Sequence, residues 1–232
     1  MMSGNAAAAS TPQPASKDDL VSPSAYFQTT PPGITYLQYS LDKEPEYLPQ
    51  IRELISRDLS EPYSIYVYRY FLYQWAEHCF MAVDATDNNK LAGVVICKLE
   101  PHREGPMRGY IAMLATKEKF RGKGIATTLV SKAIDLMIAK DADEIALETE
   151  ETNTAAMKLY ERLGFLRSKK LHRYYLNGNS AYRLLLYLKE GVGGIPIEED
   201  YNDINHLPSR VEDEMKYPHH DPAQIACSRG II

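Results

Sequence analysis

The sequence contains few cysteines, and these follow no recognisable pattern. Its 232 residues include three, Cys79, Cys97 and Cys227. An odd number without Cys-x-x-Cys spacing indicates neither a disulfide framework nor a zinc site. The sequence therefore predicts a protein without a metal site, in a reducing compartment such as the cytosol or the nucleus.

Long apolar segments and basic stripes are also missing. No window approaches the apolar length that a bilayer span needs, and the mean hydropathy is −0.37. Residues 1–24 are rich in Ala, Ser and Pro, without the basic start and apolar core of a secretory signal. The net charge is −5, and no basic stripe suggests nucleic acid as a partner. We therefore expect neither membrane nor nucleic acid to be a direct partner.

The composition favours one folded domain between two polar ends. With 44% hydrophobic residues, the chain can bury one sizeable core. Residues 1–32 carry five prolines and few large apolar side chains, which predicts disorder. Residues 191–232 carry eight acidic and three basic residues, and we expect this tail to be flexible or to bind a partner. The predicted domain therefore spans residues 33–190.

Apolar periodicity orders the domain as strand, two helices, three antiparallel strands, helix, strand, helix and two strands. The expected strands are residues 34–40, 79–85, 91–99, 109–115, 144–149, 166–175 and 181–188, and the expected helices are 44–58, 65–75, 125–139 and 153–163. Ser64 is the predicted N-cap of the second helix. Asn-rich segments at residues 87–89 and 177–179 predict turns. This order is typical of an α/β fold with a mixed, mostly antiparallel sheet and helices on both faces.

The most informative segment is a glycine-rich turn, Arg121-Gly122-Lys123-Gly124-Ile125-Ala126, between a strand and a helix. Unpaired N–H groups at a helix start, with the positive end of the helix dipole, form a site for a pyrophosphate. A Walker P-loop is excluded, because Lys117 stands where its first glycine belongs. A dinucleotide fold would carry such a turn in an early strand–helix–strand unit, whereas this turn lies past mid-chain. An ordinary surface turn is the remaining alternative.

The pattern Arg-x-x-Gly-x-Ala resembles the acetyl-coenzyme A motif of the GNAT acetyltransferases, and residues 153–165 resemble the form found in N-terminal acetyltransferases. Three strings, at residues 59–66, 108–111 and 173–177, look like those of NatC-type catalytic subunits. The resemblance covers residues 34–188 and implies a GNAT fold with acetyl-CoA as co-substrate. The cofactor-binding residues that it implies are Leu114, Ala115, Arg121, Gly122, Lys123, Gly124, Ile125, Ala126, Asn153 and Tyr160.

Acetyl transfer to an amine requires a proton acceptor, donors for the oxyanion and a proton for the departing thiolate. Strand alternation predicts that Glu148 and Glu150 share one face. The resemblance singles out Glu148 as the base, acting through water, whereas we expect Glu150 to be a solvated charge. It also points Tyr160 at the coenzyme sulfur, as a proton donor or an orienting group. A backbone N–H near Leu114 or Ala115 is the expected oxyanion donor.

The resemblance further implies a wall around the first residues of a peptide substrate. Its members are Leu59, Glu61, Tyr63, Tyr110, Tyr174 and Tyr175. Tyrosine hydroxyls would bond the peptide backbone, and Glu61 would bond the free α-amine or the backbone. The implied substrates begin with Met and a bulky hydrophobic residue, such as Met-Leu, Met-Ile or Met-Phe. Packing of these tyrosines in the core is the alternative.

Family members of the NatC type act in the cytoplasm at the ribosome, with a large auxiliary subunit and a small Sm-like subunit. The same partners and place are therefore expected here. Two other functions stay open. One is a GNAT enzyme for lysine side chains or small amines, which would prefer an internal-lysine peptide over a Met-Leu peptide. The other is a non-catalytic acyl-CoA-binding scaffold, which would bind acetyl-CoA without turnover.

Overall fold

The computed structural model describes residues 30–58, 63–103, 105–175, 177–189 and 191. The predicted domain lies almost wholly within these ranges. Residues 1–29 and 192–232 lie outside them, so the disorder expected at the N-terminus and the flexibility or partner binding expected of the tail stay predictions. Leu59 and Glu61 also lie outside the described residues.

The order of helices and strands agrees with the sequence-based prediction. The elements are β1 (Ile34–Gln38), α1 (Glu44–Asp58), α2 (Ile65–Gln74), β2 (Phe80–Asp84), β3 (Lys90–Pro101), β4 (Met107–Thr116), α3 (Ile125–Ala139), β5 (Glu144–Glu150), α4 (Thr154–Arg162), β6 (Leu166–Leu171) and β7 (Ala181–Tyr187). Three short 3-10 turns, which the periodicity does not predict, are η3 (Leu41–Lys43), η4 (Ala76–His78) and η5 (Glu118–Phe120). Ser64 is the N-cap of α2, but its side chain makes no capping hydrogen bond.

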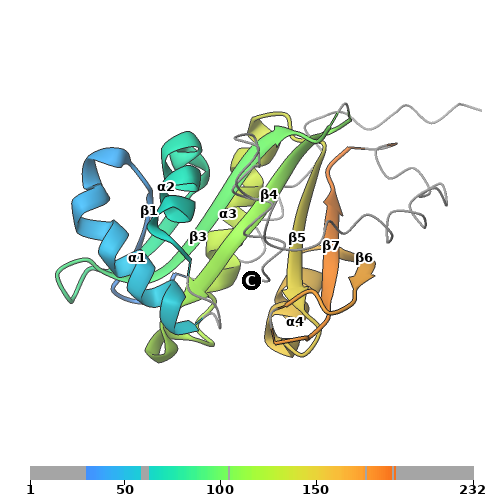
Figure 1. Ribbon diagram of the computed structural model, residues 1–232. Coiled ribbons are helices and arrows are strands. Elements are labelled where there is room, and N and C mark those ends of the chain that lie inside the picture. Colours follow the sequence, from blue (N-terminus) through green and yellow to red (C-terminus); the bar gives the residue numbers. More distant parts are fainter. Residues whose placement is uncertain (1–29, 59–62, 104, 176, 190, 192–232) are drawn as a thin grey trace, which may run out of the picture.

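The seven strands form one sheet in the order β1-β2-β3-β4-β5-β7-β6 (Figure 1). Only β4 and β5 pair in parallel, and every other neighbouring pair is antiparallel. β3 is buried along most of its length, as expected for a central strand that is covered on both faces. The predicted mixed, mostly antiparallel sheet is therefore confirmed.

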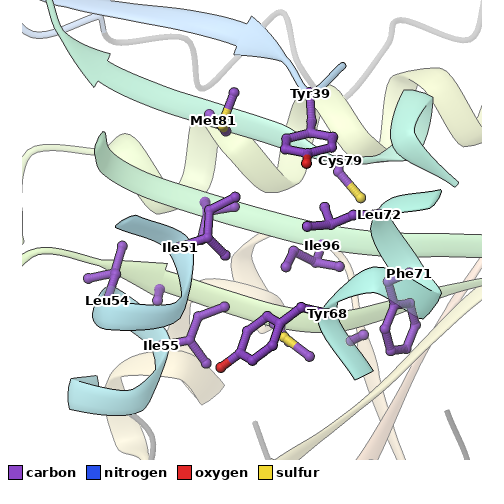
Figure 2. Close-up of a cluster of buried hydrophobic side chains, with 14 of the residues drawn as sticks. Tyr39, Ile51, Leu54, Ile55, Tyr68, Phe71, Leu72, Cys79, Met81 and Ile96 are labelled. Carbon is purple, nitrogen blue, oxygen red and sulfur yellow. The ribbon is translucent and has the colours of Figure 1, made fainter. Parts of the chain in front are cut away.

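Helices α1 and α2 cover one face of the sheet. Their apolar residues recur at spacings of three and four and point into one cluster with β2 and β3 (Figure 2). The side chains of this cluster that Figure 2 labels are Tyr39, Ile51, Leu54, Ile55, Tyr68, Phe71, Leu72, Cys79, Met81 and Ile96. Tyr110, Ala146 and Leu185 belong to the same cluster, so these positions of β4, β5 and β7 also face α1 and α2.

Helices α3 and α4 cover the opposite face. Ile125, Leu129, Ala133 and Met137, one helical turn apart, are buried in a second cluster. α4 contributes Met157 and Tyr160, and the sheet contributes Ile111, Leu147 and Leu184. The helices therefore lie on both faces, as the element order predicts.

Strands β4 and β5 part soon after they meet. Three register pairs join them, Arg108 with Glu144, Gly109 with Ile145 and Tyr110 with Ala146. Both strands continue without further pairing to one another, and Figure 1 shows them side by side at their amino ends and apart at their carboxyl ends. We call the region between residues 111–116 of β4 and residues 147–150 of β5 the β4–β5 splay.

A β-bulge in β4 lies where the splay begins. Ile96 of β3 pairs with Met113 and Cys97 pairs with Ile111, so Ala112 is the extra residue. A bulge bends its strand and increases its twist. It also shifts the alternation, because Ala112 and Met113 both belong to the cluster under α1 and α2. The bulge therefore accounts for the departure of β4 from β5.

The predicted strand over residues 166–175 is too long. β6 ends at Leu171, and residues 172–180 connect it to β7. Arg173 has a φ of 51°, a left-handed conformation that a strand does not accommodate. Tyr174 and Tyr175 therefore lie in a loop rather than in a strand. The predicted turn near Gly178 is present, with the Gly178 N–H donating to the Tyr175 carbonyl at 2.8 Å.

Candidate active site

The glycine turn opens α3 with free backbone donors. Gly122 and Gly124 have φ values of 73° and 80°, which favour glycine. Gly124 is the N-cap of α3, and no side chain caps it. The first amide bonded within the helix is that of Thr128, which donates to the Gly124 carbonyl at 3.0 Å. The N–H groups of residues 125–127 therefore remain available to an anion at the positive end of the helix dipole.

The surroundings of the turn fit a diphosphate. Arg121, Gly122 and Lys123 are exposed, and a Cβ placed on Gly122 would meet no atom within 4 Å. The turn is thus open to solvent and carries two cations beside the free amides. Arg121 Nη2 also lies 3.1 Å from Asp58 Oδ2 at the end of α1. The residues present therefore fit the diphosphate part of acetyl-CoA.

Glu148 is a buried carboxylate beside the splay, with a residue exposure of 2%. The Tyr110 hydroxyl donates to its Oε2 at 2.8 Å, and Arg183 Nε donates to its Oε1 at 2.7 Å. Leu147 and Thr149 are buried as well, and Leu147 belongs to the cluster under α3 and α4. The predicted alternation along β5 is therefore confirmed.

Glu150 differs from Glu148 in its surroundings. It is half-buried at the end of β5, and its Oε1 accepts a hydrogen bond from the Asn179 side chain. The Glu151 N–H donates to the Ser180 carbonyl at 2.9 Å. These bonds hold the β6–β7 connection against the carboxyl end of β5. Glu150 is therefore both partly exposed and bonded to a loop, so the expectation of a solvated charge is only partly correct.

Tyr160 reaches the site from the other face of the sheet. It is 1% exposed and packs edge-on against Phe165, with ring centroids 5.5 Å apart. Burial, and secondarily the nearby Cys97, raises the pKa of its phenol well above the ordinary value. Glu148 faces α1 and α2, whereas Tyr160 lies under α3 and α4. The two side chains therefore belong to opposite faces of the sheet, beside the part of β5 that no longer pairs with β4.

The remaining cofactor-binding candidates surround the splay and the glycine turn. Asn153 is the N-cap of α4, and its Oδ1 accepts a hydrogen bond from the Ala156 N–H at 3.1 Å. Leu114 and Ala115 lie on the part of β4 that has left β5. Ile125 is buried and Ala126 half-buried at the start of α3. The capping role of Asn153 is confirmed, and its contact with the cofactor stays a prediction.

The peptide-wall candidates fall into two groups. Tyr63 and Tyr110 belong to the cluster under α1 and α2, and Tyr63 packs edge-on against Tyr68 at 5.6 Å. Tyr174 and Tyr175 pack edge-on against one another at 5.3 Å in the β6–β7 connection. The first group thus lies on the β4 side of the splay and the second group near the end of β5. Tyr63 and Tyr110 thus have core contacts, so the alternative of core packing is partly correct.

The sequence reasoning missed Arg183. Its signal is a single basic residue in the otherwise apolar and aromatic strand Ala181–Tyr187. Pairing this strand with β5 places Arg183 directly opposite Glu148. The antiparallel register, which the sequence does not specify, was needed to identify the contact.

Two kinds of feature are absent from the part of the chain that the structure describes. No group of three or more His, Cys, Asp or Glu side chains there could hold a metal ion. Among the described helices, none has both the length and the apolar character needed to cross a membrane.

Comparison with known proteins identifies the family and the fold. Residues 48–165 match the acetyltransferase (GNAT) family. The chain is 56% identical over 142 residues to N-alpha-acetyltransferase 30 of Schizosaccharomyces pombe, covering 61% of this chain and 93% of that protein. It is 51% identical over 156 residues to the human protein of that name, covering 67% of this chain but only 41% of the human one.

Solved structures agree with this relationship. The crystal structure of the NatC complex bound to Gag peptide and CoA contains a chain that superposes with a TM-score of 0.65 at 50% identity, over 67% of this chain and 99% of that one. Ard1 from Thermoplasma volcanium, at 20% identity, shares the fold, with a TM-score of 0.59 over 68% of this chain and 99% of that one. The chain therefore belongs to the acetyltransferase (GNAT) family. It is an N-terminal acetyltransferase with acetyl-CoA as its co-substrate, and the expected fold and activity are confirmed.

Proposed function

We propose that this enzyme acetylates the α-amine of protein chains that begin with Met and a bulky hydrophobic residue, as the catalytic subunit of a NatC-type complex. The observation that carries the chemistry is the Glu148 carboxylate, held at the splay by Tyr110 on β4 and Arg183 on β7. The substrate preference is supported by the 50% identity to the chain of the NatC complex that was crystallised with a peptide and CoA.

Glu148 is the proton acceptor in this proposal. An α-amino group has an ordinary pKa near 8, so a weak base acting directly or through water suffices to remove its proton. Glu148 is buried and bonded on both oxygens, which fixes the direction of its lone pairs. It lies at the start of the splay, where an amine approaching from the α1 and α2 side would arrive.

Acetyl-CoA, when bound, supplies the acetyl group as a thioester. The amides of residues 125–127 would hold its diphosphate, with Arg121 and Lys123 adding positive charge. The backbone N–H groups near Leu114 and Ala115 would stabilise negative charge on the carbonyl oxygen. Tyr160 would donate a hydrogen bond to the sulfur. Because burial raises the pKa of its phenol, Tyr160 is a weaker acid than a thiol, so its role is orientation more than proton transfer.

Tyrosine hydroxyls and apolar side chains would form the wall around the peptide. Tyr63 and Tyr110 approach from the β4 side, and Tyr174 and Tyr175 approach from the β6–β7 connection, which Glu150 and Ser180 hold near the splay. Leu59 and Glu61 are proposed for the same wall from resemblance alone. A pocket of this kind separates side chains that differ by one methylene by only about 1–3 kcal/mol, so several bulky second residues should be accepted.

A panel of peptides tests the substrate assignment. The purified full chain, alone and with its candidate partners, is incubated with labelled acetyl-CoA and peptides that begin Met-Leu, Met-Phe, Met-Glu or Ser-Gly. A peptide with a blocked N-terminus and an internal lysine is included. The proposal expects the highest kcat/KM on Met-Leu and Met-Phe. A preference for the internal lysine, or binding of acetyl-CoA without turnover on any peptide, would overturn it in favour of one of the two rival functions.

The proposed base has its own test. Glu148→Gln should lower kcat by roughly 10²-fold or more, within the range for loss of a general base, and leave acetyl-CoA binding nearly unchanged. The measurement is steady-state kinetics on a Met-Leu peptide together with calorimetric titration of acetyl-CoA. A Glu148→Gln enzyme with the wild-type kcat would remove the base assignment but not the substrate class.

The partners and the cellular place belong to the same proposal. A large auxiliary subunit, a small Sm-like subunit and the cytoplasmic ribosome are proposed because the NatC structure is that of a complex. Affinity purification of the tagged chain, with and without RNase treatment of the extract, identifies bound proteins and separates ribosome association from subunit assembly. Recovery of the chain as a monomer, free of both subunits, would count against this part.

A further inference from the structure

We propose that Arg183 is a positioning residue for acetyl transfer, which holds the Glu148 carboxylate in the orientation that accepts the proton of the amine. This inference rests on the proposed role of Glu148 as the base. Arg183 belongs to β7, outside both the glycine turn and α4, the helix that carries Tyr160. It therefore adds a third strand to the site, after β4 with Tyr110 and β5 with Glu148.

Arg183 and Glu148 contact one another directly across two neighbouring strands. Glu148 and Arg183 are register partners across β5 and β7, so their side chains project from the same face of the sheet. Arg183 Nε donates to Glu148 Oε1 at 2.7 Å, and the Tyr110 hydroxyl donates to Oε2 at 2.8 Å. One carboxylate is thus held from two sides by groups on three strands. With both oxygens engaged, the carboxylate plane cannot turn without breaking one bond.

Burial explains why a cation is needed here. The side chain of Glu148 is 3% exposed, and an ionised carboxylate without a compensating charge is strongly disfavoured at that depth. An arginine stays protonated at every relevant pH and bonds a carboxylate in a fixed geometry. Arg183 itself is 39% exposed, so its charge is partly hydrated while it stabilises the buried partner.

Other charged groups surround the pair. On β3, Lys98 lies over the Tyr110 ring and pairs with Glu100. His102 lies close enough for Arg183 to help lower its pKa, after burial and two other arginines. Glu150 follows two residues along β5, and Lys169 is the register partner of Arg183 on β6. Arg183 donates directly to a Glu148 oxygen.

The test is a set of Arg183 variants of the full chain, measured with acetyl-CoA and a Met-Leu peptide. Arg183→Gln should lower kcat by roughly tenfold, a part of what the base contributes. The KM for acetyl-CoA should not change. Arg183→Lys, which keeps the charge, should recover part of kcat.

A double-mutant cycle separates positioning from a structural role. In a Glu148→Gln background, Arg183→Lys and Arg183→Gln should cause no further loss of kcat, because the group that they position is already gone. Arg167 of β6, which pairs with the exposed Glu161 of α4 at 2.7 Å, is the matched control, and Arg167→Gln should behave as wild type.

Each outcome decides between the proposals. A slow Glu148→Gln enzyme beside an Arg183→Gln enzyme with the wild-type kcat would overturn the role of Arg183 and leave the proposed function standing. A fast Glu148→Gln enzyme would instead overturn the base assignment. If Arg183→Gln does not fold, Arg183→Lys is measured in its place. An equal loss of kcat from this substitution in the wild-type and Glu148→Gln backgrounds would overturn the proposal.

Discussion

Arg108 and Glu144 are register partners at the closed end of the β4–β5 pairing, and an ion pair joins them. Arg108 Nη2 and Nε both lie 2.6 Å from Glu144 Oε1. The Glu144 side chain is 3% exposed and that of Arg108 is 20% exposed. The pair therefore fastens the two strands at the point from which they later diverge, and any opening of the splay starts from this fixed end.

Breaking this pair should destabilise the whole domain. Arg108→Met keeps the straight apolar part of the side chain but leaves the Glu144 carboxylate buried without its cation. Removal of one partner of a buried pair costs about 3 kcal/mol or more. Urea denaturation should therefore show a lower midpoint with an unchanged slope. Lys90→Gln, which breaks the exposed pair with Asp87, is the control, and an equal shift in both variants would refute the fastening role.

Replacing Gly124 should weaken acetyl-CoA binding. Its φ of 80° is unfavourable for a branched side chain, and it is the residue from which the free amides of α3 begin. We expect Gly124→Val to raise the Kd for acetyl-CoA by roughly tenfold or more, since 1.4 kcal/mol corresponds to tenfold. Isothermal titration measures this Kd. The control is Gly191→Val, because Gly191 has a similar φ of 81° and a Cβ placed there would meet no atom within 4 Å. An equal loss of acetyl-CoA affinity in that variant would point to general strain.

Removing the hydroxyl of Tyr160 should have a smaller effect than removing the charge of Glu148. Tyr160→Phe keeps the ring that packs against Phe165. If the hydroxyl mainly orients the sulfur, kcat should fall by about tenfold or less, with the melting temperature nearly unchanged. Rapid-mixing kinetics with a Met-Leu peptide, alongside Tyr187→Phe as an exposed control, measure this. A loss as large as that of Glu148→Gln would assign Tyr160 the proton transfer itself.

The two described cysteines should resist alkylation in the folded protein. Burial raises the pKa of Cys79 to about 12, although a hydrogen bond with the backbone of Cys97 works in the opposite direction. Burial, and then the neighbouring Cys79, raises the pKa of Cys97 well above its ordinary value. Because both pKa values lie above pH 8, both thiols stay protonated there and react slowly. Iodoacetamide labelling at pH 8 followed by peptide mapping should modify them only after denaturation, and rapid labelling of either native thiol would contradict this.

Much of the fold could be predicted because its signals are local. The spacing of Ile125, Leu129, Ala133 and Met137 predicts α3 with no knowledge of the sheet, and alternation along β5 places Glu148 and Leu147 on opposite faces. The end of β6 could not be predicted in this way, because residues 172–175 have strand-like composition. The left-handed conformation of Arg173, which ends the strand, depends on the path of the loop.

The arrangement of the site depends on contacts that are distant in sequence. Arg183 meets Glu148 only because β7 inserts between β5 and β6, an order that composition does not specify. The position of Tyr160 on the face opposite Glu148 likewise follows from the packing of α4. The family motifs correctly indicated the GNAT fold and acetyl-CoA, whereas the roles of the individual site residues stay predictions until the variants are measured.

The extra residue at Ala112 has a consequence for engineering. Before it, even-numbered positions of β4 point toward α1 and α2, and after it, odd-numbered positions do so. A chimera with a crossover inside β4 that drops one residue would invert every side chain from there to Thr116. Exchange of segments between related enzymes should therefore transfer residues 107–116 as a single block.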